Sequence, residues 1–242
     1  MISGNETSLH QASQIINEHF MNRIIMICEG PTEQAFAKTN LQIPLIHKNI
    51  ILQAPLIKAS RGGIVKWSRL KNQIETHLKS EPDAFVTTFI DYYGLYSKYQ
   101  FPGWDNAHMI ADKSNRIQAL EQSMLQDIDP SLQHRFIPYL QLHEFEGLLF
   151  NDINIIYSQI PPGDIVGKAE LEKTFADYQN PEMINNNRET SPSHRLQRII
   201  KGYNKIVYGD ILSEAIGLIR MRAKSPRFND WISKIESLAP LV

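Results

Sequence analysis

Acidic side chains follow three apolar segments of the chain, and these are the residues whose type and spacing could do chemistry. They are Glu29, Glu33, Asp91, Glu144 and Glu146. Carboxylates that converge repel one another unless a cation neutralises them, and hard oxygen ligands suit Mg²⁺ or Mn²⁺ better than zinc. Because one Mg²⁺ usually takes only one or two protein carboxylates, this set could hold two ions for phosphoryl transfer.

The spacing limits which acids can act together. Glu29 and Glu33 are four positions apart and share a face if the turn between them is helical. Glu144 and Glu146 share a face in extended structure but point apart on a helix, so only one of them is a ligand if a helix starts early. A glutamate at a helix start is also stabilised by the helix dipole alone. The joint placement of the acids therefore predicts the metal site.

Strands must position these acids. Residues 23–28 (RIIMIC) form a short apolar run, typical of a strand buried on both faces of a parallel sheet. Residues 84–90 (AFVTTFI) predict a second strand, and residues 136–142 a third. Ligands of open α/β sheets bind beyond the carboxyl ends of the strands, so we expect the acids to meet at one edge.

Helical patterns alternate with these strands and then dominate the C-terminal part. Helices are expected over residues 32–40, 64–79, 106–126, 193–203, 211–223 and 228–238. A helix or turn is expected over residues 143–150, a strand with an edge or loop within 45–58, and an ordered aromatic loop over 92–104. This order predicts an α/β fold with a mostly parallel sheet flanked by helices. The expected parts are a polar lead-in (1–20) with a short helix near residues 11–20, an α/β domain (21–150) and a helical C-terminal region (151–242).

The amino-acid composition limits the classes of function that the sequence can predict. The 242 residues carry 25 basic and 26 acidic side chains, so bulk charge does not predict coating of nucleic acid, although a local basic groove remains compatible. The single cysteine, Cys28, excludes an internal disulfide and a cysteine zinc cluster; it favours a cytoplasmic protein and a buried thiol. No apolar run approaches the roughly 18 residues that span a bilayer, and no signal peptide is evident.

Basic and aromatic groups complete the candidate site. Candidates for phosphate binding are Lys58, Arg61, Lys66, His194, Arg195 and Arg198. Of these, His194 and Arg195 are favoured, because the preceding Ser-Pro-Ser opens a helix whose N-terminus attracts anions. Arginine also binds phosphate bidentately and stabilises developing charge, so Arg195 is a catalytic candidate together with Glu29 and Asp91. A solvated helix face is the alternative. The aromatic residues of 92–104 could stack unpaired bases, but a loop held by its own aromatics is favoured. His143 could orient a carboxylate or shuttle a proton, but a structural histidine is favoured.

At the acidic residues the sequence resembles the Toprim fold, which topoisomerases, bacterial primases and overcoming-lysogenization-defect nucleases share. Residues 27–33 (ICEGPTE) resemble its first motif, and residues 88–94 (TFIDYYG) occupy the place of its Asp-x-Asp motif. More closely, the chain resembles the bacterial family called domain of unknown function 4276. The motifs that carry this resemblance are EGPTE (29–33), DYYG (91–94), HEFE (143–146), SPSHRL (191–196) and RFNDW (227–231).

The resemblance implies a Mg²⁺-dependent nuclease, often encoded beside an ABC-type ATPase in phage-defence loci. By analogy Glu29 is a metal ligand or general acid/base, and Glu33 and Asp91 are further ligands. Tyr93 stands where the second Asp of Asp-x-Asp would be, and Glu144 or Glu146 is the expected substitute. Two other readings stay open: a Toprim-like binding subunit without catalysis that docks on the ATPase, and a phosphatase. The sequence is also compatible with a homo-oligomer.

Overall fold

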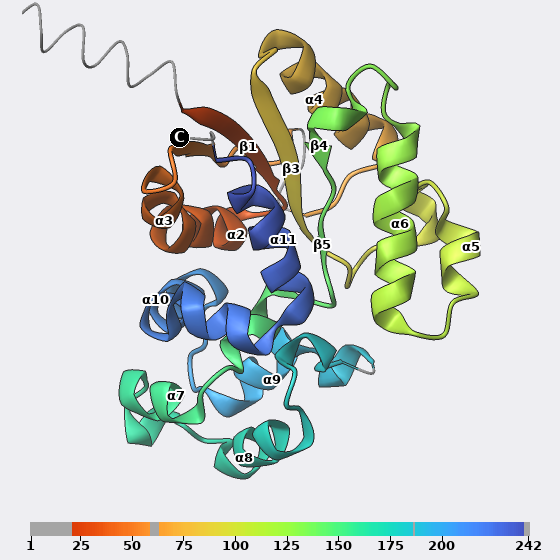
Figure 1. Cartoon of the computed structure of the whole chain (residues 1–242). Coiled ribbons are helices and arrows are strands. Elements are labelled where there is room, and N and C mark those ends of the chain that lie inside the picture. Colours follow the sequence, from red (N-terminus) through yellow and green to blue (C-terminus); the bar gives the residue numbers. More distant parts are fainter. Residues whose placement is uncertain (1–20, 59–62, 186, 240–242) are drawn as a thin grey trace, which may run out of the picture.

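A five-stranded sheet lies at the centre of the computed structural model, which describes residues 21–58, 63–185 and 187–239 (Figure 1). The strands are β1 (Asn22–Cys28), β2 (Ile50–Gln53), β3 (Ala84–Asp91), β4 (Phe136–Ile137) and β5 (Leu140–Gln141). Their order is β2-β1-β3-β4, β5 pairs with the end of β3, and every pairing among them is parallel. The predicted α/β class, parallel sheet and first two strands are confirmed.

The strand predicted over residues 136–142 is interrupted. Proline has no N–H to donate to a sheet, and Pro138 separates β4 from β5. Hydroxyl groups of β3 bridge the break: Thr87 Oγ1 donates to the Ile137 carbonyl at 2.6 Å, and Thr88 Oγ1 donates to the Tyr139 carbonyl at 2.8 Å. The chain thus stays beside β3 and delivers residues 143–150 to the end of that strand.

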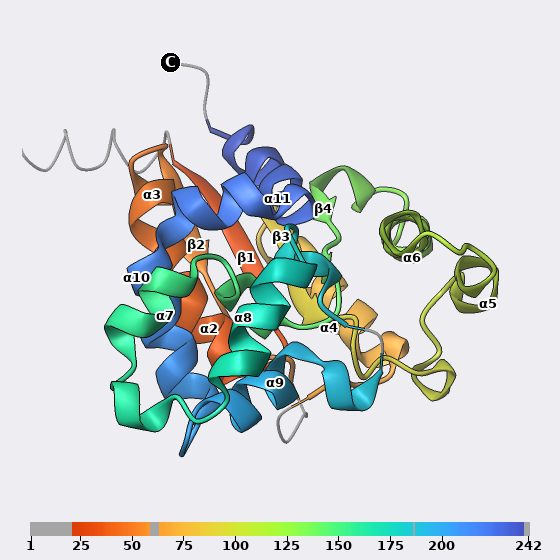
Figure 2. The ribbon, with the colours of Figure 1, turned by 90° about the horizontal axis from the view of Figure 1, so that it is seen from below.

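Helices cover both faces of the sheet, because alternate residues of β1 point to opposite faces. Ile24 and Met26 join one hydrophobic core with the C-terminal helices, and Ile25 and Ile27 join another with the central helices. The first face carries α2 (Pro31–Phe36), α3 (Gln42–Ile46), α10 (Lys205–Lys224) and α11 (Pro226–Glu236); the second carries α4 (Trp67–Ser80), α5 (Trp104–His108) and α6 (Lys113–Asp127). Figure 2 shows β1 and β3 between these two groups.

Three further helices lie beyond the ends of β3 and β5 in Figure 1: α7 (Ile153–Gln159), α8 (Lys168–Asp177) and α9 (Pro192–Ile199). The helices α10 and α11 pack into the core that contains β1, and the Trp231 indole donates to Thr87 Oγ1 at 2.9 Å. The division at residue 150 stays a prediction. No helix among the described residues is both long and apolar enough to cross a membrane.

Several helix boundaries differ from the sequence prediction. The helix after Pro31 continues through a π-helical turn (Ala37–Leu41) into α3, so only Ile50–Gln53 of the predicted segment 45–58 is a strand. The helix predicted over 106–126 is two helices, because Asp112 caps α6 by accepting the Asn115 N–H at 2.8 Å. The short helix predicted near residues 11–20 lies outside the described residues.

The start of α10 is the boundary that matters most for the site. Asn204 Oδ1 accepts the N–H groups of Ile206 and Val207, so the helix begins at Lys205 rather than at the predicted residue 211. Gly209 then lets α10 approach α2, since a Cβ there would lie 3.0 Å from Thr32 Cγ2. These local features carry Lys205 to the carboxyl edge of the sheet.

Candidate functional site

Glu29 and Asp91 meet at the carboxyl ends of two adjacent parallel strands. Cys28 of β1 pairs with Phe89 of β3, so the residues that follow lie side by side. Glu29 Oε2 accepts the backbone N–H of Asp91 at 3.0 Å, and the Glu29 N–H donates to the Phe89 carbonyl at 3.1 Å. The structure therefore brings together the two acids that the sequence places at the ends of separate strands.

Glu33 joins them from the first turn of α2. Its Oε2 accepts the Gly30 N–H at 2.9 Å, which fixes the turn between β1 and α2, and the side chain is only 3% exposed. Burial raises the pKa of Glu33, Lys205 opposes this shift, and the neighbouring Glu29 and Glu146 carboxylates add to it. The spacing of four residues between Glu29 and Glu33 thus places both acids at one site.

Glu144 and Glu146 point to different partners because a 3₁₀ helix, η4 (Phe145–Leu149), begins between them. Asp91 Oδ1 accepts the Phe145 N–H at 2.8 Å and so fixes the start of that helix. Glu144 accepts hydrogen bonds from Ser193 N at 2.9 Å and Ser193 Oγ at 2.8 Å, at the N-terminus of α9. Glu146 instead is fully buried against Lys205. The structure thereby assigns Glu146 to the converging acids.

Lys205 supplies the positive charge of the site. Its Nζ lies 3.0 Å from Glu146 Oε1 and 3.8 Å from Asp91 Oδ2. Asp91, Glu146 and Glu33 raise the pKa of the Lys205 ammonium against the opposing effect of its burial. Sequence reasoning missed this residue, because a lysine at a helix start far along the chain belongs to no motif of the acidic set.

Burial is the main cause of the altered acidities. It raises the pKa of Glu29 to about 7 and that of Glu33 to about 7, and it raises the pKa values of Asp91 and Glu146 as well. Lys205 opposes each of these shifts, while the neighbouring carboxylates add to them. A single ammonium therefore does not fully neutralise the four acids, and Glu29 can hold or release a proton near neutral pH.

The donor set fits a hard divalent cation. All four side chains offer carboxylate oxygens, and neither oxygen of the buried Glu146 accepts a well-formed hydrogen bond among the described residues, although Lys205 pairs with it by charge. In the described part of the chain, no three acids, histidines or cysteines already surround one point as metal ligands. The Lys205 ammonium lies among the acids instead.

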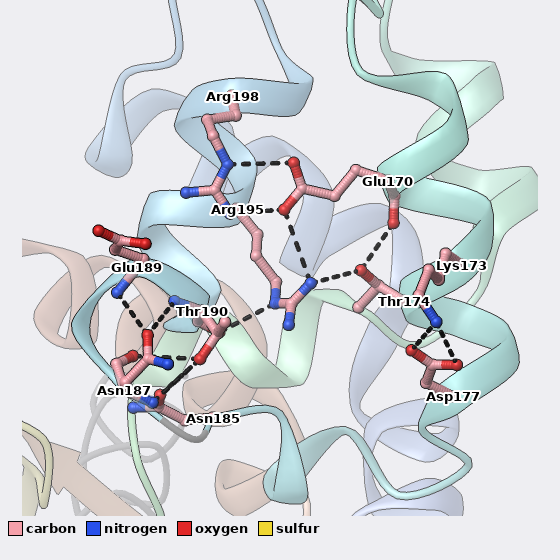
Figure 3. A network of polar contacts seen from close by, with 10 residues as sticks. All are labelled: Glu170, Lys173, Thr174, Asp177, Asn185, Asn187, Glu189, Thr190, Arg195 and Arg198. Atoms are coloured by element: carbon pink, nitrogen blue, oxygen red, sulfur yellow. Dashed lines mark hydrogen bonds and ion pairs between the residues drawn. The ribbon is translucent and has the colours of Figure 1, made fainter.

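Arg195 and Arg198 belong to a different network, the outer network, which connects α9 with α8 (Figure 3). Arg195 Nε donates to the Thr190 carbonyl at 2.9 Å, and its Nη1 donates to Thr174 Oγ1 at 3.1 Å. Arg198 forms two hydrogen bonds to Glu170, at 3.1 and 2.5 Å. Within the part of the chain that the structure describes, neither guanidinium contacts the converging carboxylates. The structure does not bring the predicted catalytic Arg195 to them.

The other predicted phosphate-binding residues are scattered. Lys58 is exposed and follows Ile57, whose N–H donates to the Cys28 carbonyl at 3.0 Å, so it lies near the same edge as Glu29. Lys66 is exposed just before α4. His194 Nδ1 forms a 2.8 Å hydrogen bond with Ser191 Oγ. Arg61 lies outside the described residues.

Two further groups near the site, His143 and Cys28, are buried. His143 adopts a left-handed backbone conformation (φ 68°), and its Nε2 lies 3.3 Å from Lys113 Nζ. Burial and the neighbouring Lys113 lower the pKa of His143 to about 3, so the ring is neutral. Cys28 is fully buried, and burial raises the pKa of its thiol, which confirms the prediction of a buried thiol.

The fold and site define an α/β protein with a buried acidic cluster at the carboxyl edge of a parallel sheet. A family model described as domain of unknown function (DUF4276) matches residues 28–236, and the chain belongs to this family. The matched range contains all four acids and Lys205. No curated protein and no solved structure matches the chain significantly.

Proposed function

We propose that the protein is a Mg²⁺- or Mn²⁺-dependent nuclease that hydrolyses phosphodiester bonds of DNA or RNA. One observation carries the proposal: Glu29 and Glu33 of one turn, Asp91 and Glu146 come from three segments of the chain and converge in a largely buried site with raised pKa values. Such crowding costs folding free energy, and chains retain it where the acids have a task. Four hard carboxylates suit one or two divalent ions.

The proposed roles follow from the geometry. Asp91, Glu146 and Glu33 would hold the ion, with Glu29 as a further ligand or as the general base, since its pKa of about 7 suits proton transfer at neutral pH. A bound Mg²⁺ would polarise the phosphoryl oxygens and acidify a water molecule. Tyr93 occupies the position of the second Asp in the Toprim-like Asp-x-Asp pattern. In this account Glu146 supplies the missing carboxylate.

Phosphate contacts come, in this proposal, from Lys58, which lies near the edge of the sheet, and from Lys66 and Arg61 of the segment that follows it in the chain. Arg195 and Arg198 are engaged by Glu170 and by polar groups of α8 and the preceding loop, so we assign them no contact with the reacting phosphate. We also place the protein in the cytoplasm, because its only cysteine forms no disulfide. An ABC-type ATPase partner in phage defence follows from the resemblance alone.

A second candidate is a Toprim-like subunit that binds the ATPase without chemistry. The position of Lys205 favours it, because an internal ammonium lets the acids remain together without a metal ion. In this reading the acidic cluster is a structural ion-pair network. The two candidates differ in one property, the ability of the site to bind a divalent ion and to cleave.

Cleavage assays on circular single- and double-stranded DNA and on RNA, with Mg²⁺ or Mn²⁺, separate them. We expect cleavage by the unaltered protein and a loss of roughly 100-fold or more in Glu29→Gln and Asp91→Asn, as for removal of a catalytic or ligand group. Glu170→Gln is the matched control, because it removes a carboxylate of the outer network. Unaltered cleavage by folded Glu29→Gln and Asp91→Asn variants refutes the assignment of these residues to the active site. If the unaltered protein cleaves no substrate with either metal ion, the result supports the binding subunit.

A further inference from the structure

The loop after Asp91 forms a surface hollow of about 480 Å³. Its walls include Ser97, Gln100, Phe101, Trp104, Asp105 and Asn106. Neither the acidic site nor the proposed metal chemistry uses this hollow. Its size is within the range of small-ligand sites, and one of its walls is an aromatic ring.

Two residues with a left-handed backbone conformation, Gln100 and Gly103, line the hollow. Gly103 has a φ of 71°, and a Cβ at this position would lie 2.1 Å from Ser123 Oγ, so close packing against α6 requires glycine. Gln100 adopts the left-handed conformation with a φ of 57°, which is uncommon for a residue with a side chain. Phe101 is buried against Trp67, with 5.4 Å between the ring centroids. The backbone conformation of the loop and its packing therefore determine where its polar side chains lie.

The lining has the chemistry of a nucleobase site. Trp104 offers an indole face, and every base can stack on an aromatic ring. The amides of Gln100 and Asn106 each donate and accept hydrogen bonds, as the edges of bases do. Among the described residues that line the hollow there is no lysine or arginine, so the chemistry suits an uncharged ring better than a phosphate. Lys98 lies beside it, 5.1 Å from the Tyr99 ring.

Aromatic contacts connect the hollow to the acidic site. Tyr92 follows Asp91 directly, and its hydroxyl lies 3.1 Å from His108 Nε2. The His108 ring packs on Trp104 at an angle of 34° with 4.0 Å between the centroids, and the Tyr92 and Trp104 rings are 6.4 Å apart. A series of ring contacts thus joins the residue after Asp91 to the aromatic wall of the hollow.

We propose that the hollow binds an unpaired base of the nucleic acid substrate, which makes the substrate a strand that is single-stranded beside the cleaved phosphate. The inference rests on the proposed nuclease function and adds the substrate class. A paired base cannot enter, since its edge is bound to its partner and its faces are stacked. DNA and RNA share the base chemistry, so the hollow does not select between them.

Binding without cleavage tests the proposal. Fluorescence anisotropy in EDTA is measured with a labelled 12-nucleotide DNA strand, the same RNA strand and a blunt DNA duplex. Trp104→Ala should weaken binding of single strands roughly 5- to 150-fold, the effect of losing one stacked base, and leave duplex binding unchanged. Trp104→Phe, which retains an aromatic face, should recover most of the affinity.

Tyr96→Ala is the matched control, because Tyr96 is an aromatic side chain of the same loop that is 55% exposed and does not line the hollow. Asn106→Ala should weaken binding of single strands without removing the ring. Thermal unfolding verifies that each variant is folded. The DNA and RNA strands show whether the sugar matters, and a loss on either strand supports the base site.

Equal affinity of Trp104→Ala and unaltered protein for single strands overturns the inference, as does an equal loss on the duplex or the absence of any strand binding. The same measurements distinguish failure of the base site from failure of the nuclease proposal. Cleavage that depends on Glu29 while Trp104→Ala binds normally refutes only the base site. Strand binding that depends on Trp104, with no cleavage under any metal, supports the base site and refutes the nuclease.

Discussion

Two charged networks of this molecule differ in how their charges are balanced. In the outer network between α9 and α8, two arginines share the Glu170 carboxylate, and Thr174 and Thr190 accept further hydrogen bonds from Arg195 (Figure 3). At the edge of the sheet, four acids share one lysine. In the whole network of Figure 3, the acidic Glu170, Asp177 and Glu189 match the basic Lys173, Arg195 and Arg198, so its charges balance, and it lies partly in water. The second is buried with an excess of negative charge.

The difference separates a structural network from a candidate site. Ion pairs near the surface contribute little to stability and need no further partner. Buried carboxylates that outnumber their cations are costly, and their pKa values rise in response. The acidic site can relieve that cost by binding protons or a divalent ion, whereas the outer network gains nothing from either. Four predictions sharpen this contrast, from the largest expected effect to the smallest.

Replacement of Lys205 should have the largest effect on stability. Lys205→Met leaves the buried acids without a cation at pH 8, and we expect a loss of about 2–3 kcal/mol in the free energy of unfolding. This is less than for a fully buried pair, because the lysine side chain is 43% exposed. Mg²⁺ should restore part of the loss. Urea unfolding with and without Mg²⁺ measures both effects, and an unchanged midpoint contradicts the account.

The stability of the folded protein should decrease as the pH rises through the acidic site's titration. Glu29 and Glu33 have folded pKa values of about 7 against an ordinary glutamate value of 4.5, so the folded state binds more protons than the unfolded state between these values. The contribution of these two carboxyl groups to the stability of the folded state is fully present below about pH 4.5 and is lost as the pH rises through 7. We expect a loss on the order of 1–3 kcal/mol across this window.

Urea unfolding at a series of pH values measures this dependence. The double variant Glu29→Gln and Glu33→Gln carries neutral side chains at every pH, so its stability should vary much less over the same window. Glu170→Gln, in the balanced network, should keep the dependence of the unaltered protein. A stability that rises between pH 5 and 7 in the unaltered protein would contradict the raised pKa values.

Glu146 and Glu144 should differ in metal binding. Calorimetry with Mn²⁺ should show an affinity at least about tenfold lower for Glu146→Gln, which removes a charged oxygen donor from the site. Glu144→Gln should bind Mn²⁺ nearly as well, because Ser193 already occupies both of its oxygens. The reverse order of affinities shows that the wrong member of the pair has been assigned.

Replacement of the outer arginines should have the smallest effect. Arg195→Ala loses its hydrogen bonds to Thr190 and Thr174 and should cost about 1–2 kcal/mol. Arg198→Ala breaks a more exposed pair and should cost less than about 1 kcal/mol. Neither should change cleavage by the folded protein. Abolished cleavage in a fully folded Arg195→Ala would restore the catalytic role that the sequence suggested.

The sequence predicted the parts of the site that follow from local patterns. Apolar runs define β1 and β3, and the residue after each run is the acid that the structure places at the edge. The spacing rule for Glu144 and Glu146 also anticipated that an early helix would separate them. These features depend on strand periodicity and on the geometry of a single turn, which neighbouring residues determine.

Long-range packing determined what the sequence did not predict. Lys205 reaches the acids because Gly209 permits close contact between α10 and α2, and no local pattern encodes that contact. The helix start at Ser191-Pro192-Ser193 was expected to bind a substrate anion near Arg195. It does bind an anion, but that anion is Glu144 of the same chain. A motif can thus specify a kind of contact without specifying the partner.

The most direct test of the central claim is Mn²⁺ binding to the folded protein, measured by calorimetry at pH 8 alongside Glu29→Gln, Asp91→Asn and the control Glu170→Gln. The account predicts binding to the unaltered protein and to the control, and its loss in the two site variants. Absence of binding by the unaltered protein, or equal binding by all four proteins, contradicts the claim that these acids form a divalent-metal site.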